Sequence, residues 1–372
     1  MKVEKISKDN TSKIWIVRSG RDSAFYRNFK VNNLIAIGHI QEFDIQVPEG
    51  PISKESKEYI LETYNSKLLS SENSSRQVSS KYGQVDRFIN NIKTGDTVIT
   101  VSSNAISVGI ITSECYFNET SIEVLGDDKQ DDCYFNLRYD VIWGKEQPRS
   151  TIPYSVELSL RNNGTVFSIS DEEKIKYLSH WINPIHVYES EVRCSVNITL
   201  TTEISNRQLT KLSILLDKLE VLSNYIDDNF ESEKIDFDGF VSYFNENELT
   251  FDYKLTAQHD FMSPGFQFLQ LSGSQRKRMI FAILFSIIFS MSITEVEGNE
   301  VPDKLVLQAN SILEQLDKKD KFTVTISDLH AKILENVAPK KPVVPKLDER
   351  LDNTSIEDPD FPESIESSES ML

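Results

Sequence analysis

Residues 82–113 read YGQVDRFINNIKTGDTVITVSSNAISVGIITS, and this stretch decides the fold. Apolar residues recur at helical spacing between Gln84 and Ile92, which predicts a short helix there. Gly95 and Asp96 then predict a turn, and the apolar runs TVITVSS and SVGIITS on either side of a Ser-Ser-Asn break predict two strands. A helix followed directly by neighbouring strands favours a mixed α+β fold.

Working outward from this stretch, short apolar runs predict further strands. We expect buried strands at IWIVRS (14–19), LIAIGHI (34–40), RYDVIWG (138–144) and TVFSIS (165–170). A helix is predicted over 53–69, where apolar residues form one stripe, and the polar stretch 20–30 is predicted to be a loop. This order suits a small mixed β-barrel with outer helices, and we predict such a domain over residues 1–175.

A second, smaller α+β domain is predicted over residues 190–336, with a role in oligomerisation or partner binding. The sequence EVRCSVNITLTTE predicts a strand, and leucines at three- and four-residue steps predict a helix over 206–230. The runs FDGFVSYF and ELTFDYKLTA alternate and predict a hairpin, and further helices are predicted over 276–293 and 301–317.

The net charge of −18 lies mainly outside the N-terminal region. Residues 1–170 carry 20 Lys/Arg against 22 Asp/Glu, whereas residues 347–372 carry nine acidic residues and one Arg. The Pro-rich and acidic segment 337–372 has few large apolar residues, so we predict a disordered tail. Because the N-terminal region is nearly neutral, the overall charge does not exclude a nucleic-acid partner.

The run MIFAILFSIIFSMSI, residues 279–293, contains no charged residue. Its 15 residues fall short of the about 20 that a bilayer core requires. A central buried helix of the second domain is therefore favoured. A membrane-associated defence effector built on this helix stays open as an alternative.

Six segments together carry a resemblance to a known family: IWIVRSG (14–20), LIAIGHI (34–40), YGQVDRFINNIKTGDTVIT (82–100), VGIITSECYF (108–117), RYDVIWG (138–144) and TVFSIS (165–170). In order and spacing they resemble the PUA-like (EVE-related) domains at the N-terminus of Mrr-type and other modification-dependent restriction systems. The resemblance implies binding of modified or unusual nucleobases. His39 departs from the family pattern, because relatives usually carry an aromatic residue there, and an imidazole stacks less well and titrates near neutral pH.

A domain that inspects a base needs aromatic walls, polar groups for the base edge and basic residues for the flanking phosphates. The resemblance thereby implies nucleobase- or phosphate-binding roles for Trp15, Arg18, Ser19, His39, Tyr82, Gln84, Arg87, Tyr116 and Trp143, with Phe117 as further ring surface. Core roles stay open for the two tryptophans, and helix capping or solvation stays open for Gln84 and Arg87.

The sequence shows no catalytic constellation and therefore disfavours an enzyme. Three cysteines and five histidines lack metal-ligand spacing, and no cofactor or metal is predicted. Asp44, Glu55 and Lys57 match the bare spacing of a metal-dependent nuclease, but they fall in a Pro-containing stretch and at a helix start, so we interpret the match as accidental. A cryptic nuclease within 191–334 is the other alternative.

These observations together predict a cytoplasmic nucleic-acid sensor of a bacterial defence or restriction-type system. Its expected partner is DNA or RNA with a modified base, and a free nucleotide is not excluded. A separate catalytic protein and a second copy of the chain are further partners left open, whereas a membrane is disfavoured.

Overall fold

The computed structural model describes residues 1–6, 13–71, 74–126, 130–161, 164–232, 235–247, 250–261, 265–335, 337 and 339. Within Met1–Lys340, which form one compact unit, the described chain has the mixed α+β fold expected from the sequence. The predicted disordered tail lies outside the described residues, apart from Val337 and Pro339. Val337 itself is buried in the core.

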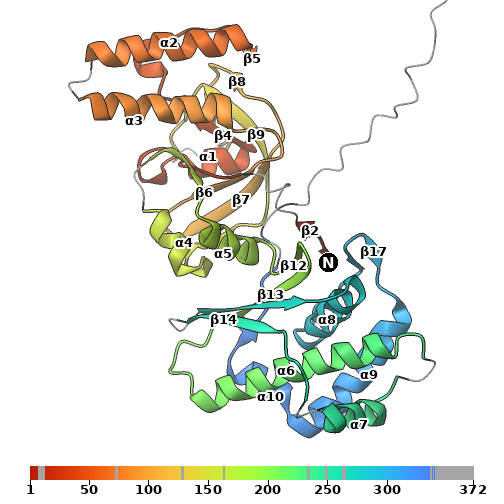
Figure 1. Ribbon diagram of the computed structural model, residues 1–372. Coiled ribbons are helices and arrows are strands. Elements are labelled where there is room, and N and C mark those ends of the chain that lie inside the picture. Colours follow the sequence, from red (N-terminus) through yellow and green to blue (C-terminus); the bar gives the residue numbers. More distant parts are fainter. Residues whose placement is uncertain are drawn as a thin grey trace, which may run out of the picture. The chain divides into compact units, whose positions relative to one another are not determined.

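A strongly curled mixed sheet, a half-barrel, fills the N-terminal region (Figure 1). Its strand order among the described residues is β11-β3-β6-β7-β9-β8-β5, with β10 paired to β7 and β4 paired to β9. Strands β3 and β6 are parallel, and the other pairs are antiparallel. The strands are β3 (Ile14–Val17), β4 (Leu34–Ile37), β5 (Gly50–Pro51), β6 (Thr97–Val101), β7 (Ala105–Ile111), β8 (Tyr116–Phe117), β9 (Leu137–Trp143), β10 (Gln147–Pro148) and β11 (Val166–Ile169).

Two long helices, α2 (Lys54–Ser71) and α3 (Ser75–Asp86), pack against each other at one end of this region (Figure 1). The helix predicted over 84–92 is the end of α3 together with one wider π turn, Arg87–Asn91. The predicted loop 20–30 is wrong in its second half, which forms helix α1 (Tyr26–Val31). This helix forms because Phe29, fully buried, anchors one face of it in the core.

A second sheet has the order β14-β15-β13-β12-β2 among the described residues, with β18 paired to β13. Its strands are β2 (Lys5–Ile6), β12 (Ile185–Tyr188), β13 (Glu191–Ile198), β14 (Thr256–Phe261), β15 (Gly265–Ser272) and β18 (Ala331–Lys332). One face packs on α6 (Asn206–Asp228) and α8 (Gln275–Ile288). On the other face, Phe266 and Phe268 share a core with α4 (Tyr154–Ser159) and α5 (Glu172–Ile182).

The helices of this second region follow the leucine pattern. Helix α6 begins at a capping box, in which the Ser205 hydroxyl accepts from the backbone N–H of Gln208 and the Gln208 side chain accepts from the backbone N–H of Ser205. Helices α9 (Asp303–Asp320) and α10 (Phe322–Asp328) complete the layer. These elements confirm the predicted strand at 191–198 and the helices near 206–230 and 301–317.

The apolar run at 279–293 lies largely in α8, and its side chains Ile280, Phe281 and Leu284 are fully buried in the core. This placement confirms the expected core helix. Within the described part of the chain, no helix combines the length and the apolar character that crossing a bilayer requires.

The predicted hairpin between FDGFVSYF and ELTFDYKLTA is wrong. The first run forms helix α7 (Phe237–Asn247), and only the end of the second forms a strand, β14, which pairs with β15. Alternation misled because Phe237, Phe240 and Phe244 also recur at three- and four-residue steps, the spacing that places side chains on one helix face. Phe240 is buried on that face, where it contacts Tyr225 of α6.

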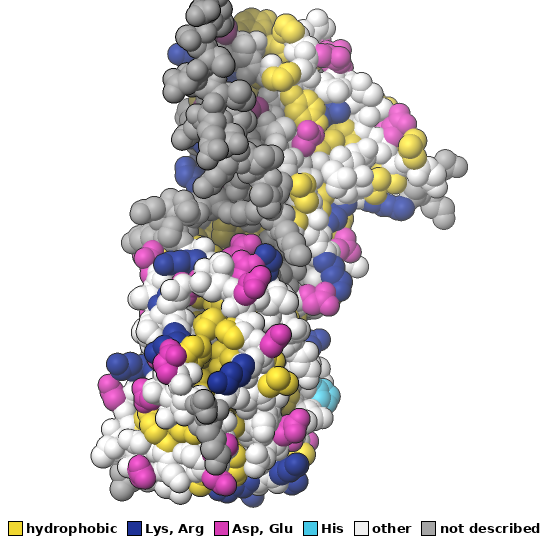
Figure 2. All heavy atoms as spheres, turned by 90° about the vertical axis from the view of Figure 1, so that its right-hand side faces the viewer, with side chains coloured by type: hydrophobic (Ala, Val, Ile, Leu, Met, Phe, Trp, Pro, Cys, Tyr) yellow, Lys and Arg dark blue, Asp and Glu magenta, His cyan; other side chains and the backbone are white. Residues whose placement is uncertain are grey.

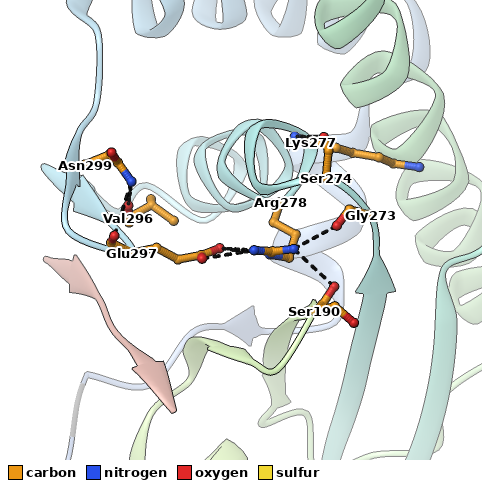
Figure 3. A network of polar contacts seen from close by, with 8 residues as sticks. All are labelled: Ser190, Gly273, Ser274, Lys277, Arg278, Val296, Glu297 and Asn299. Carbon is orange, nitrogen blue, oxygen red and sulfur yellow. Dashed lines mark hydrogen bonds and ion pairs between the residues drawn. The ribbon is translucent and has the colours of Figure 1, made fainter. Parts of the chain in front are cut away.

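A small third sheet joins β1 (Lys2–Val3) to the hairpin of β16 (Glu295–Val296) and β17 (Asn299–Glu300). The Arg278 guanidinium of α8 holds the tip of this hairpin by binding Glu297, and it also donates to backbone oxygens of Gly273 and Ser190 (Figure 3). One buried cation therefore ties α8, the hairpin and the β12–β13 turn together.

Charged side chains of both signs are interspersed on the face drawn in Figure 2, and apolar side chains lie between them on its lower part. A nucleic-acid backbone binds best to an extended basic surface. The described residues drawn on this face form no such extended basic surface.

Candidate functional site

Two segments leave the curled sheet beside each other, after β3 and after β4, and both border the ring of Phe135. Pairing of Ile37 with Leu137 places Gly38 near the start of β9, where Phe135 lies. A Cβ at Gly38 would come within 2.8 Å of the Phe135 ring. A Cβ at Gly20 would lie 3.8 Å from the same ring. Glycines thus allow the two segments to approach one aromatic ring closely.

Phe25 adds a second ring to this place. It meets Phe135 edge to face, with ring centroids 5.1 Å apart and ring planes at 77°. Gly20 has a φ of +82°, a left-handed conformation that turns the chain after Ser19 toward Phe25. The backbone N–H of Phe25 donates to the carbonyl oxygen of Ser19 at 2.9 Å, which fixes this turn.

Ser19 is fully buried at this turn. Its hydroxyl makes no hydrogen bond to the described residues. Burying a hydroxyl without a partner costs about 1–3 kcal/mol. A polar ligand group that formed a hydrogen bond with Ser19 would recover this free energy. Ser19 is therefore the best candidate in the site for a hydrogen bond to a ligand.

His39 follows Gly38 and is half-buried beside α3. Burial, with a smaller contribution from Lys81, lowers the pKa of His39 from 6.5 to about 4. The expectation that this imidazole titrates near neutral pH is therefore wrong, because desolvation opposes its charged form. At pH 7 the ring is neutral and offers one N–H donor and one nitrogen acceptor.

Three of the polar candidates gather along the segment that leads into β11. The guanidinium of Arg18 donates to the Leu160 carbonyl oxygen, the side-chain oxygen of Gln84 accepts from the backbone N–H of Thr165, and Arg87 Nε donates to the Val166 carbonyl oxygen at 3.2 Å. Burial, followed by repulsion from Arg149, lowers the pKa of Arg18. All three side chains therefore hold this segment in place.

The aromatic candidates Trp15 and Trp143 lie apart from Ser19 and Phe135. Trp15 is 1% exposed, and its indole N–H donates to Asp96 at 2.8 Å. Trp143 is six residues beyond Leu137 along β9, about 20 Å at the rise of a strand. Its indole N–H donates to the Phe29 carbonyl oxygen at 3.1 Å. Both tryptophans thus have structural partners of their own.

The remaining aromatic candidates are also held by other contacts. Tyr116 donates to Asp140 at 2.8 Å, and burial, followed by the bond to Asp140, raises the pKa of Tyr116. Phe117 is fully buried, and Tyr82 of α3 packs on the core of the curled sheet. The structure therefore places Phe25 and Phe135 against the turn that contains Ser19, with His39 next in the chain to Gly38, while these other rings have partners of their own.

Phe25 and Phe135 were not among the residues singled out from the sequence. Phe25 lies within the polar stretch 20–30, which was predicted to be a loop. Phe135 lies in an irregular segment without periodicity, and only the pairing of β4 with β9 brings it to Gly38.

Residues 13–169 match the family model described as Domain of unknown function (DUF8426). The matched range coincides with the curled sheet from β3 to β11. No curated protein matches the chain at a significant level. The family description names no ligand and no activity, so the chemistry of the site rests on its own residues.

The described residues contain no group of side chains that is suited to hold a metal ion. No three His, Cys, Asp or Glu side chains lie together there as metal ligands would. Glu55 and Lys57 lie in the first turn of α2, whereas a metal-dependent nuclease carries such residues on a strand. Asp44 ends a short 3₁₀ helix.

Proposed function

We propose that the N-terminal region binds a nucleobase at the Ser19–Phe135 site and acts as the nucleic-acid sensor of a bacterial defence or restriction-type system. The base would be modified or otherwise unusual, and it would be presented by DNA or RNA. The PUA-like resemblance of this region supports the proposal. Residues 190–336 would then contact a second copy or a partner that carries the catalysis.

The observation that carries the proposal is the buried hydroxyl of Ser19, which makes no hydrogen bond to the described residues and lies at the turn that leads to Phe25 and Phe135. A nucleobase has a flat face for stacking and polar atoms on its edge. Phe25 and Phe135 offer the ring surface, Ser19 offers a hydroxyl, and the neutral His39 offers both a donor and an acceptor. These groups match the two needs of a flat heterocycle.

Arg87 supports a nucleic acid over a free base. Only its Nε is bonded, to the Val166 carbonyl oxygen, and the other guanidinium nitrogens have no bonding partner among the described residues. Free N–H groups of a guanidinium suit a phosphate oxygen. We expect Arg87 to contact the backbone that flanks the recognised base.

Binding of short fluorescent oligonucleotides, with and without a modified base, tests the proposal. Ser19→Ala is expected to weaken binding about threefold to tenfold, the usual worth of one hydrogen bond. Phe135→Leu is expected to weaken it at least as much, because stacking contributes about 1–3 kcal/mol per base.

Thr100→Val is the matched control for Ser19→Ala. Thr100 is also fully buried and its hydroxyl also has no hydrogen-bonding partner among the described residues, but it lies on β6. The Thr100→Val variant should bind the oligonucleotides with the same affinity as the unmodified protein. Equal affinity in all three variants, or cleavage of DNA by this chain with Mg²⁺ or Mn²⁺, would reject the proposed sensor in favour of another binding site or of the nuclease alternative.

A further inference from the structure

A cavity of about 800 Å³ lies where the curled sheet region meets the second sheet. The β6–β7 turn, the residues around α4 and the ends of β13 and β15 line it, including Asn104, Arg149, Tyr154, Glu157, Asn197 and Phe266. None of its lining residues belongs to the Ser19–Phe135 site. Its volume falls within the range of small-molecule sites, which often lie between packed substructures.

One wall of the cavity is held rigidly by an ion pair. Arg149 donates to the two carboxylate oxygens of Glu157 at 3.1 and 3.0 Å, and it donates to the Ser102 carbonyl oxygen at 2.9 Å. A bidentate pair of this kind fixes both side chains. Because the two charges compensate each other, the wall favours an uncharged ligand over a polyanion.

Asn197 presents a side-chain amide to the same cavity. Asn197 of β13 is only 5% exposed, and its side-chain amide makes no hydrogen bond to the described residues. A carboxamide offers a donor and an acceptor side by side. Because the Asn197 amide lines the cavity, both groups are available to a ligand that carries the complementary acceptor and donor.

Apolar surface flanks this amide. Phe266 pairs with Asn197 across the two strands and stacks on Phe268 with ring planes 5° apart. Tyr154 at the rim is 56% exposed, although most large aromatic side chains in this region are buried. The cavity thus offers ring surface together with one polar pair, a composition typical of sites for flat organic molecules.

We propose that this cavity binds an uncharged heterocycle of nucleoside size, whose adjacent donor and acceptor pair with the Asn197 carboxamide. Adenine carries such a pair at N6 and N7, and Asn commonly binds it in this way. The site is independent of the Ser19–Phe135 site, so either can fail without the other.

Calorimetric titration of the full chain with adenosine tests the inference. Asn197→Leu is expected to weaken binding about tenfold or more through the loss of two hydrogen bonds. Purine riboside, which lacks the exocyclic amine, should bind the unmodified protein more weakly than adenosine. Adenosine monophosphate should not bind more tightly, because Glu157 already compensates Arg149.

Two further variants make the result unambiguous. Asn197→Thr keeps a residue suited to a strand and serves if the Leu variant unfolds. Leu307→Ala, at an exposed position of α9 outside both proposed sites, should leave adenosine binding unchanged. Absence of saturable adenosine binding, or equal affinity in the protein with and without the Asn197 substitutions, overturns the inference.

Discussion

Arg278 and Glu297 meet as a bidentate ion pair that is nearly closed to solvent. Arg278 Nε and Nη2 donate to the two carboxylate oxygens at 2.8 and 2.9 Å, and the two side chains are 8% and 4% exposed (Figure 3). The second terminal nitrogen of Arg278 donates to the Gly273 carbonyl oxygen at 2.8 Å. The pair therefore leaves few groups unbonded when it is intact.

Removal of one partner from this pair should strongly destabilise the chain. Glu297→Gln or Arg278→Met leaves a buried group without its counter-charge, and we expect a loss of about 3–5 kcal/mol in the free energy of unfolding. Urea denaturation measures it. Arg276→Met, which breaks the more exposed contact with Asp227, should cost less than about 1 kcal/mol. If Arg276→Met lowered the free energy of unfolding as much as Glu297→Gln or Arg278→Met, this account would be contradicted.

Two buried histidines should make stability depend on pH. His186 Nδ1 donates to the Asn183 carbonyl oxygen at 2.7 Å, and His180 Nδ1 lies 3.0 Å from the Ser195 hydroxyl. Burial lowers the pKa of His186 from 6.5 to about 4, and burial lowers the pKa of His180 well below 6.5, helped by His186 and the neighbouring Arg193.

The unfolded chain therefore binds protons on these rings before the folded chain does. The free energy of unfolding should be highest above pH 6.5 and fall as the pH drops from 6.5 toward 4, by about 3 kcal/mol for His186 alone. Urea midpoints at several pH values measure the fall. His186→Gln, which keeps a donor for Asn183, should flatten the curve between pH 6.5 and 5, and an unchanged slope would count against this cause.

Gly38 and Gly83 should respond in opposite directions to alanine. A Cβ at Gly38 meets the Phe135 ring, so Gly38→Ala should displace this ring and weaken oligonucleotide binding at least threefold. A Cβ at Gly83 lies 3.4 Å from Arg87, and Gly83 lies in α3, so Gly83→Ala should raise stability by about 0.5–1 kcal/mol. Thermal unfolding and the binding assay distinguish the two, and equal behaviour would refute the proposed role of Phe135.

The buried apolar side chains of α8 should contribute strongly to the free energy of unfolding. Phe281 is fully buried, so Phe281→Ala is expected to cost about 3–5 kcal/mol. Leu307 of α9 is 70% exposed, and Leu307→Ala should change the free energy of unfolding by less than about 0.5 kcal/mol. Chemical denaturation of both variants gives the comparison, and a small loss for Phe281→Ala would argue that α8 is not part of the folding core.

Local periodicity was enough to predict helices α2, α6, α8 and α9 and the central strands, but it revealed only the end of α3. The leucine spacing of α6 and the apolar runs of β6 and β7 indicate which of their residues are buried, so no distant residue is needed to interpret them. Helix α7 was missed because its apolar run was interpreted as a strand, although Phe237, Phe240 and Phe244 have the three- and four-residue spacing of one helix face.

The candidate site was only partly accessible to sequence reasoning. Ser19 and His39 follow strands that the sequence reveals, whereas Phe135 reaches them through a strand pairing about 100 residues apart in the chain. Trp15 was predicted to stack on a nucleobase because the neighbouring sequence does not reveal its hydrogen bond to Asp96, which is 81 residues away. Non-local partners decide these roles, and periodicity carries no information about them.

The pairing of β3 with β11 brings Ile14 opposite Ile169, so the curled sheet region starts and finishes at one spot. Strand β2, which precedes this region, pairs with β12, which follows it, and Lys5 lies opposite Val187 in this pairing. Closing so long a loop carries an entropy penalty that grows with its length. Once the intervening 157 residues of the matched family range have folded, that loop is effectively short. We therefore expect the parallel β2–β12 pairing to form late in folding, after the curled sheet region between these two strands has folded.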